Sequence, residues 1–321
     1  MKKAFIFLIY LIFALLTLTV YIKNKNSEKN ISTLMPTANG NNEQQGNPIN
    51  TNSQNIKVIH APESAFFAGE ELPLSYSDVR ESLERELNQI TYSHSATLLT
   101  IRLSGRYFGT IDSILKKHGL PDDFKYLCVA ESNLQNAISP AKAVGFWQFL
   151  SDVAEYYGLE VNDEVDERYN IEKSTVAACK YLKDAYQKYH NWQLAAASYN
   201  MGMTNLNKVI ENQQMHNYCD LILNTETGRY LYRIVAYKII LSNPELYGFH
   251  IADNEKFKPF KFYEIAVNYP IMNLAEFAKK HNTNYKIIKI LNPWLRKNQL
   301  TNRAKKTYKI KIPAENFRIA E

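Results

Sequence analysis

One glutamate in this sequence has the setting that acid–base chemistry requires. Residues 121–133 are expected to form a helix, because Pro121 suits the first turn of a helix. Its apolar stripe consists of Phe124, Leu127 and Cys128, and Glu131 continues that stripe at helical spacing. A carboxyl group on the core side loses hydration, which raises its pKa and keeps it protonated near neutral pH. Glu131 is therefore a candidate general acid, and an exposed helix end is the alternative.

The next segment with chemical potential is Gly145-Phe146-Trp147-Gln148, which follows Ser139-Pro140. The glycine permits close approach of the backbone, and the amide of Gln148 can orient a sugar amide or hydroxyl group. Trp147 has two interpretations. It is a possible glycan contact, offering an apolar face to a sugar ring, or it packs in the core.

A third segment places two polar side chains at the end of a helix. Leu194 to Ala197 favour a helix that runs into Tyr199 and Asn200 and stops at Gly202. The polar tips of Tyr199 and Asn200 are then free to meet a ligand. The alternative is an ordinary helix C-cap without further function.

In this order, the three segments resemble the signature of the soluble lytic transglycosylase (SLT) catalytic domain, a lysozyme-like family. The matching motifs are Glu131-Ser132, Gly145-Phe146-Trp147-Gln148 and Ala196-Ala197-Ser198-Tyr199-Asn200-Met201-Gly202. Gly119-Leu120-Pro121 before the first motif, and Glu226-Thr227 with Tyr230 after the last, look most like the membrane-bound members. The resemblance covers about residues 76–245.

The resemblance implies a role for each matched residue. Glu131 is the expected catalytic acid and base, Tyr230 lies near it, and Trp147 and Ser198 depart from the usual motifs in ways that affect subsite preference. The substrate-binding residues carried over in this way are Ser139, Gln148, Tyr199, Asn200 and Tyr230.

The implied reaction cleaves the β-1,4 bond between N-acetylmuramic acid and N-acetylglucosamine in peptidoglycan. No second Asp or Glu occurs in the three motifs, so the partner carboxylate of a standard glycosidase is missing. The resemblance implies that the substrate's N-acetyl group assists, and that its 6-hydroxyl closes a 1,6-anhydro ring without water. Two alternatives are open: a goose-type lysozyme on the same fold, and a non-catalytic wall-binding protein.

The elements that must position these residues are expected to be helices. Apolar residues recur at three and four spacing from about Leu74 to Ser242, with Pro, Gly or Asn between segments. We predict a mainly α, lysozyme-like fold with no substantial sheet in this part. The expected helices are 75–119 (more than one), 121–133, 149–157, 172–189, 192–200, 203–212 and 226–242.

A small β-α-α-β module is expected after Pro259. Its strands are 261–267 and 306–312, and its helices are 273–281 and 284–291. The order of elements resembles a LysM domain, which implies binding of N-acetylglucosamine-containing glycans. The usual Gly-Asp-Thr-Leu start is here Ile271-Met272-Asn273-Leu274, so a purely structural appendage is the alternative.

The N-terminus predicts export to the cell envelope. Ala4 to Ile22 form an apolar run long enough to cross a bilayer. We therefore expect residues 1–23 to be a membrane anchor, or alternatively a cleaved signal, with the catalytic domain in the periplasm. Residues 24–55 contain ten Asn and no aromatic residue, which is typical of a disordered linker. The expected domains are 1–23, the linker 24–56, the catalytic domain 57–250 and the LysM-like module 259–315.

Composition adds limits on partners. Residues 251–321 hold 15 Lys+Arg against 6 Asp+Glu, so the basic excess of the chain lies at the C-terminal end. It suits an anionic polymer such as the cell wall or is simply solvated surface. Cys128, Cys179 and Cys219 show no CxxC spacing, so no disulfide framework is implied. We expect no metal, no cofactor, no nucleic-acid partner and a monomer.

Overall fold

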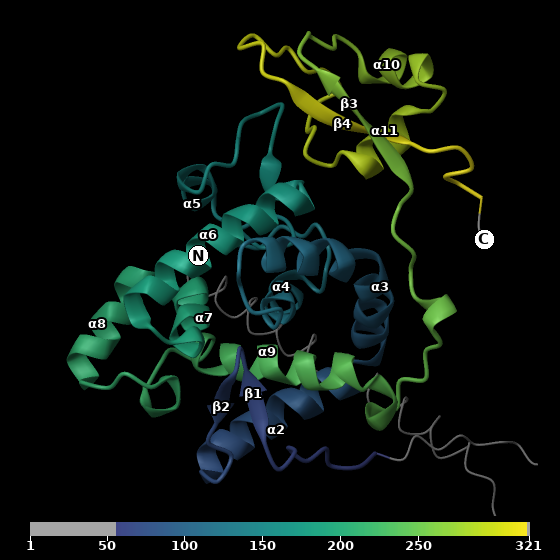
Figure 1. The fold of residues 1–321 in the computed structure, drawn as a ribbon. Helices are drawn as coiled ribbons and strands as arrows, with labels where there is room; N and C mark the ends of the chain where they lie inside the picture. Colours follow the sequence, from purple (N-terminus) through teal and green to yellow (C-terminus); the bar gives the residue numbers. More distant parts are fainter. Residues whose placement is uncertain (1–55, 320–321) are drawn as a thin grey trace, which may run out of the picture. The chain divides into compact units, whose positions relative to one another are not determined.

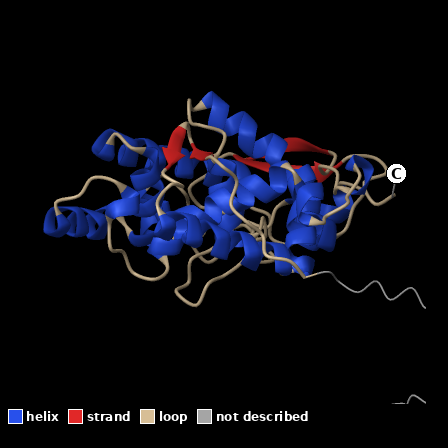
Figure 2. Ribbon diagram, turned by 90° about the horizontal axis from the view of Figure 1, so that it is seen from below, coloured by secondary structure: helices blue, strands red, loops and turns tan. Residues whose placement is uncertain are grey.

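A computed structural model describes residues 56–319 of the chain (Figure 1). This part is mainly helical, and its strands form two separate two-stranded sheets (Figure 2). The helices are α2 (Ser77–Tyr92), α3 (His94–Lys117), α4 (Phe124–Ser132), α5 (Ser151–Tyr156), α6 (Ile171–Tyr189), α7 (Trp192–Met201), α8 (Met203–Gln213), α9 (Thr227–Ser242), α10 (Leu274–Lys280) and α11 (Tyr285–Leu291). The strands are β1 (Ala65–Phe67), β2 (Glu70–Leu72), β3 (Phe262–Val267) and β4 (Tyr308–Pro313). The expected mainly α fold with a β-α-α-β module is confirmed.

Asparagine side chains fix the start of four helices. Each side-chain oxygen accepts a hydrogen bond from a backbone N–H in the first turn, which satisfies a donor that the helix itself leaves without a partner. These N-caps are Asn170 of α6, Asn191 of α7, Asn273 of α10 and Asn284 of α11.

Helix α9 lies at the centre of the larger core. It contacts α2, α4 and α7, and Figure 1 shows it between α2 and α4. Its side chains Leu231, Ile234 and Val235 are completely buried. The helix that carries Glu131 therefore packs directly against α9, which carries Tyr230.

A small hairpin was missed by the sequence analysis. Strands β1 and β2 pair antiparallel, and Ala68 and Gly69 between them both have positive φ, the conformation of a tight hairpin turn. Phe67 is buried, and its ring meets Phe124 of α4 edge to face at 5.2 Å between centroids. The hairpin thus covers the start of the helix that carries Glu131.

The C-terminal module consists of β3, α10, α11 and β4. Its strands pair antiparallel from Phe262 opposite Pro313 to Val267 opposite Tyr308. The module's apolar side chains form a second core, which also contains Val144, Val165 and Tyr169 from the preceding part of the chain. The division into residues 57–250 and 259–315 stays a prediction, and the second core extends across it.

The predicted membrane segment 1–23 lies outside the described residues, as does the predicted linker 24–56 apart from Ile56. Within residues 56–319 no helix is both long enough and apolar enough to span a membrane.

Candidate active site

Glu131 lies in the last turn of α4, and its side chain is partly buried. The stripe that leads to it, Phe124, Leu127 and Cys128, is 0% exposed. Burial raises the pKa of the Glu131 carboxyl from an ordinary 4.5 to about 7, and the charge of Glu226 adds to the increase. A carboxyl group with a pKa near 7 can both give and take a proton at neutral pH.

Tyr230 of α9 holds the carboxyl group of Glu131. Its hydroxyl donates a hydrogen bond to Oε1 of Glu131, and its ring is 2% exposed. Burial and the neighbouring carboxylate raise the pKa of Tyr230 well above its usual value, so the phenol keeps its proton and remains a donor. The expectation that Tyr230 lies beside Glu131 matches this geometry.

The segment from Ala137 to Phe149, here called the site loop, is folded onto the end of α4. The hydroxyl of Ser132 donates to the carbonyl of Phe146 at 2.8 Å, so the residue after Glu131 holds the loop directly. The N–H of Gly145 donates to the carbonyl of Ala137 at 2.9 Å, which closes the loop on itself. The site loop and Glu131 therefore share one rigid local framework.

Gly145 is required by the shape of the site loop. Its φ is +85°, and a Cβ at this position would lie 2.0 Å from the carbonyl oxygen of Arg168. Real side chains do not tolerate such a contact with a backbone atom, and positive φ disfavours them as well. The glycine thus allows residues 145 and 168 to pack backbone to backbone, as the sequence suggested.

Both amide hydrogens of Gln148 form hydrogen bonds within the site loop. Its Nε2 donates to the carbonyls of Gly145 at 2.7 Å and Ala137 at 3.1 Å, and its backbone has a φ of +48°. The side-chain oxygen is then the group that can meet a ligand, and it can only accept. The sequence predicted that the whole amide of Gln148 could orient a sugar amide or hydroxyl group, whereas in the structure only its oxygen is available for this contact.

Tyr199 and Asn200 lie near the end of α7, where helix formation stops at Gly202. The hydroxyl of Tyr199 donates to the carbonyl of Trp147 at 2.7 Å, and Asn200 accepts a hydrogen bond from the hydroxyl of Thr227 at 2.7 Å. Burial and the charge of Glu131 raise the pKa of Tyr199 well above its usual value. Both side chains therefore belong to the neighbourhood of the site loop and α9, which the sequence could not show.

Comparison with known proteins agrees with this arrangement. Residues 111–222 match the family described as the Transglycosylase SLT domain. The predicted resemblance is thereby confirmed, and the part of the chain around this match is called the SLT-type domain below. Residues 263–316 match the soluble lytic transglycosylase C-terminal LysM-like domain, so the resemblance of the module is also confirmed.

Two curated relatives carry the same name, membrane-bound lytic murein transglycosylase D. They come from Escherichia coli strain K12 and Escherichia coli O6:H1 strain CFT073, and each is 25% identical to this chain over 221 residues. The match covers 66% of this chain and 48% of each relative. The chain thus spans about half the length of the curated relatives it matches, and its likeness to membrane-bound members is confirmed.

Within the SLT-type domain, Trp147 is not available as a glycan contact. Its side chain is 0% exposed, and its indole N–H donates to the hydroxyl of Thr175 at 2.8 Å. A ring with no open face cannot stack on a sugar, so the expectation of a glycan contact is wrong for this residue. The alternative interpretation, packing in the core, describes it correctly.

Ser139 forms part of a turn in the SLT-type domain. Its Oγ accepts a hydrogen bond from the N–H of Ala143 at 3.0 Å, and the Ser139 N–H donates to the carbonyl of Ala143 at 2.9 Å. The hydroxyl proton of Ser139 is left over by these bonds. A contact of that proton with the sugar stays a prediction.

Two residues of the SLT-type domain that shape the site were missed. The sequence predicted no role for Ser132, although a hydroxyl next to a candidate acid is a signal for a local hydrogen bond. Arg168, 8% exposed, donates to the carbonyl of Phe149 at 3.2 Å. No local pattern around Arg168 indicates this contact, because its partner lies 19 residues earlier.

The described residues contain three free cysteines and no group of side chains suited to a metal ion. Cys128 and Cys179 are free and buried, and Cys219 is free and partly buried. In residues 56–319 no cluster of three His, Cys, Asp or Glu side chains is arranged to hold a metal ion.

Proposed function

We propose that this protein is a lytic transglycosylase acting on peptidoglycan. The observation that carries the proposal is the partly buried Glu131 side chain, whose carboxyl has a pKa of about 7 and accepts a hydrogen bond from Tyr230, inside an SLT-type domain. The relatives named membrane-bound lytic murein transglycosylase D support the same reaction and substrate class.

In the proposed mechanism Glu131 first acts as the general acid. It gives its proton to the oxygen of the β-1,4 bond between N-acetylmuramic acid and N-acetylglucosamine, and that bond breaks. The N-acetyl group of the muramic acid supports the electron-poor C1 as the bond breaks. Glu131, now ionised, takes the proton of the same sugar's 6-hydroxyl, whose oxygen bonds to C1 and closes the 1,6-anhydro ring. Acid and base are one group, so a pKa near neutral suits both steps.

Tyr230 and the site loop have supporting roles in this proposal. The hydrogen bond from Tyr230 keeps one carboxyl oxygen fixed and leaves the other for the glycosidic oxygen. The free oxygen of Gln148 can accept from the N–H of an acetamido group. Ser139, Tyr199 and Asn200 complete the proposed substrate-binding set.

The remaining parts fit an envelope protein. We assign the LysM-like module to binding of N-acetylglucosamine-containing glycans and the N-terminal segment to a membrane anchor, with the enzyme in the periplasm as a monomer. The family match supports the assignment of the module, and the membrane-bound relatives support the anchor and the envelope location.

A lysozyme-type hydrolase is the second candidate, because one further carboxylate influences the site. The charge of Glu226 raises the pKa of Glu131, so it lies within electrostatic range of the acid. In a hydrolase Glu226 would hold the attacking water, and the product would have a reducing end. In the transglycosylase Glu226 has no chemical step.

The deciding experiment is mass spectrometry of muropeptides released from purified peptidoglycan. It compares the wild type with Glu131→Gln and Glu226→Gln. We expect products lighter by one water, with 1,6-anhydro ends, a loss of at least about a thousandfold in Glu131→Gln, and a small change in Glu226→Gln. Reducing ends that disappear in Glu226→Gln would establish the hydrolase. If the protein releases no muropeptides in a Glu131-dependent manner, the wall-binding role remains.

A further inference from the structure

A strand-like segment of the SLT-type domain pairs with the LysM-like module. Val165 and Leu295 form an antiparallel bridge, in which the N–H of Asp166 donates to the carbonyl of Trp294 at 2.9 Å. The N–H of Arg296 donates to the carbonyl of Glu164 at 2.7 Å. The two parts are therefore joined by backbone hydrogen bonds as well as by the chain between them.

Buried side chains close this contact. Val165 is 1% exposed and Leu295 0% exposed, and the guanidinium of Arg296 lies 3.9 Å from the ring centre of Tyr169. Val144, from the site loop itself, is 5% exposed and belongs to the same core as the module's apolar residues. An apolar side chain of the site loop thus depends on the module for its burial.

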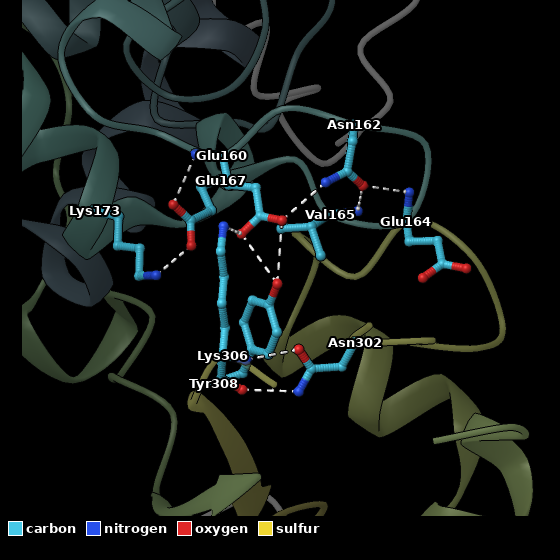
Figure 3. Close-up of polar contacts among 9 residues, drawn as sticks. All are labelled: Glu160, Asn162, Glu164, Val165, Glu167, Lys173, Asn302, Lys306 and Tyr308. Atoms are coloured by element: carbon cyan, nitrogen blue, oxygen red, sulfur yellow. Dashed lines mark hydrogen bonds and ion pairs between the residues drawn. The ribbon is translucent and has the colours of Figure 1, made fainter. Parts of the chain in front are cut away.

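Polar contacts also join the two parts, and Figure 3 shows those of Glu160 with Lys306 and Tyr308. The hydroxyl of Tyr308 donates to the carboxylate of Glu160, which also pairs with Lys306 at 3.1 Å. The carboxylate of Glu164 accepts from the N–H of Thr301 at 2.8 Å and from its hydroxyl at 3.0 Å. These bonds lower the pKa of Glu164, which means that the module stabilises its charged form.

Arg168 transmits this contact to the site loop. Its guanidinium binds Asp166 through two hydrogen bonds, at 2.9 and 2.8 Å. A third nitrogen, Nη1, donates to the carbonyls of Phe149 at 3.2 Å and Lys142 at 3.4 Å. A guanidinium suits this role because it is planar and its N–H groups point in fixed directions. The bonds to Asp166 therefore also fix the direction in which Nη1 points.

Its backbone adds a second connection, since the carbonyl of Arg168 occupies the space beside Gly145 that a Cβ would need. Arg168 therefore contacts the site loop at Lys142, Gly145 and Phe149. Asp166, which the guanidinium of Arg168 also binds, donates its backbone N–H to the carbonyl of Trp294 in the module.

We infer that Arg168 is a positioning residue and that the LysM-like module stabilises the site loop, so the module acts on catalysis and not only on attachment. The part of this inference that concerns catalysis rests on the proposed function. Gln148 needs positive φ and exact placement of its one free oxygen, and a loop in that conformation keeps its shape only when its surroundings hold it. Arg168 and Val144 make the contacts that hold the loop, and the module stabilises these contacts.

The test uses three variants of the full chain. Arg168→Lys keeps the charge and removes the fork, and Glu164→Ala removes the acceptor for Thr301 without touching the site loop. The control is Asp163→Ala, the neighbouring residue, whose carboxylate also faces a module lysine, Lys297 at 3.1 Å, but is 91% exposed. Exposed ion pairs of this kind contribute little.

Hydrogen exchange of residues 137–149 is the first readout, and it does not need activity. The amides of Val144 and Gly145 are hydrogen-bonded within the loop, so they should exchange slowly in the wild type. We expect exchange in this segment to rise about tenfold in Arg168→Lys and Glu164→Ala, with α2 unchanged. Unchanged exchange in Glu164→Ala would overturn the inference, as would an equal rise in Asp163→Ala.

Cleavage of short soluble glycan strands is the second readout. We expect kcat/KM to fall roughly tenfold in Arg168→Lys and less in Glu164→Ala, through KM more than kcat, with the pH midpoint set by Glu131 unmoved. Wild-type kinetics in Arg168→Lys would overturn the catalytic part. If the wild type cleaves no better than Glu131→Gln, the proposed function fails. The exchange data still decide whether the module stabilises the loop.

Discussion

Replacing Glu131 by Gln should make the folded protein more stable above pH 7, although it removes the proposed acid. The folded state keeps a proton on Glu131 up to a pH of about 7, and the unfolded chain releases it near the ordinary pKa of 4.5. The wild type therefore loses stability as the pH rises from 4.5 to 7, because the unfolded state binds fewer protons there. Gln carries no charge in either state and does not show this loss.

The size of the effect follows from the two pKa values. Each pH unit between them corresponds to about 1.4 kcal/mol, so the full difference is about 3 kcal/mol. Between pH 5 and pH 8 the variant should gain about 2 to 3 kcal/mol over the wild type, or roughly 5 to 10 °C in Tm for a domain of this size.

Thermal unfolding at both pH values measures this gain. Glu211→Gln is the matched control, because it removes an exposed carboxylate on α8 and should leave the wild-type pH dependence unchanged. If Glu131→Gln differs from the wild type by the same amount at pH 5 and pH 8, the carboxyl is not held protonated by the fold. The acid–base assignment would then lose its physical basis.

Three further outcomes follow from the site. Cleavage by the wild type should fall about tenfold per pH unit above a pH of about 7, as Glu131 loses its proton, and a pH profile of kcat/KM measures this. Tyr230→Phe removes a hydrogen bond that lowers the pKa of Glu131, so this alkaline limb should move to higher pH. Gly145→Ala should cost at least about 2 kcal/mol, seen as a lower Tm, because its Cβ would collide with the carbonyl of Arg168 at positive φ.

Local patterns predicted the helices well, and the reason is physical. The stripe of Phe124, Leu127 and Cys128 has helical spacing, and the core buries that face, so α4 forms where it was expected. The hairpin of β1 and β2 was missed because three-residue strands are too short to show alternation. Gly69 was a local signal for the turn, because glycine readily adopts the positive φ that the structure shows there.

The candidate site was predictable in its residues more than in its contacts. The partial burial of Glu131 followed from helical spacing, since one element determines it. The occupied donors of Gln148 and the buried ring of Trp147 depend on Ala137 and Thr175, which lie 11 and 28 residues away. Contacts of that kind are set by tertiary packing, which periodicity does not encode.

The second core also has a consequence for the order of folding. It joins Val144 and Val165 to the side chains of Ile310 and Ile312, which leave the ribosome much later than the two valines. Because segments made first can fold before later ones are synthesised, most of the SLT-type domain can form early, whereas residues 144–169 need partners from β4. A chain that stops before β4 would keep Glu131 and its helix but leave the surface around Val144 open. Synthesis of β4 would then be a step in forming the site loop.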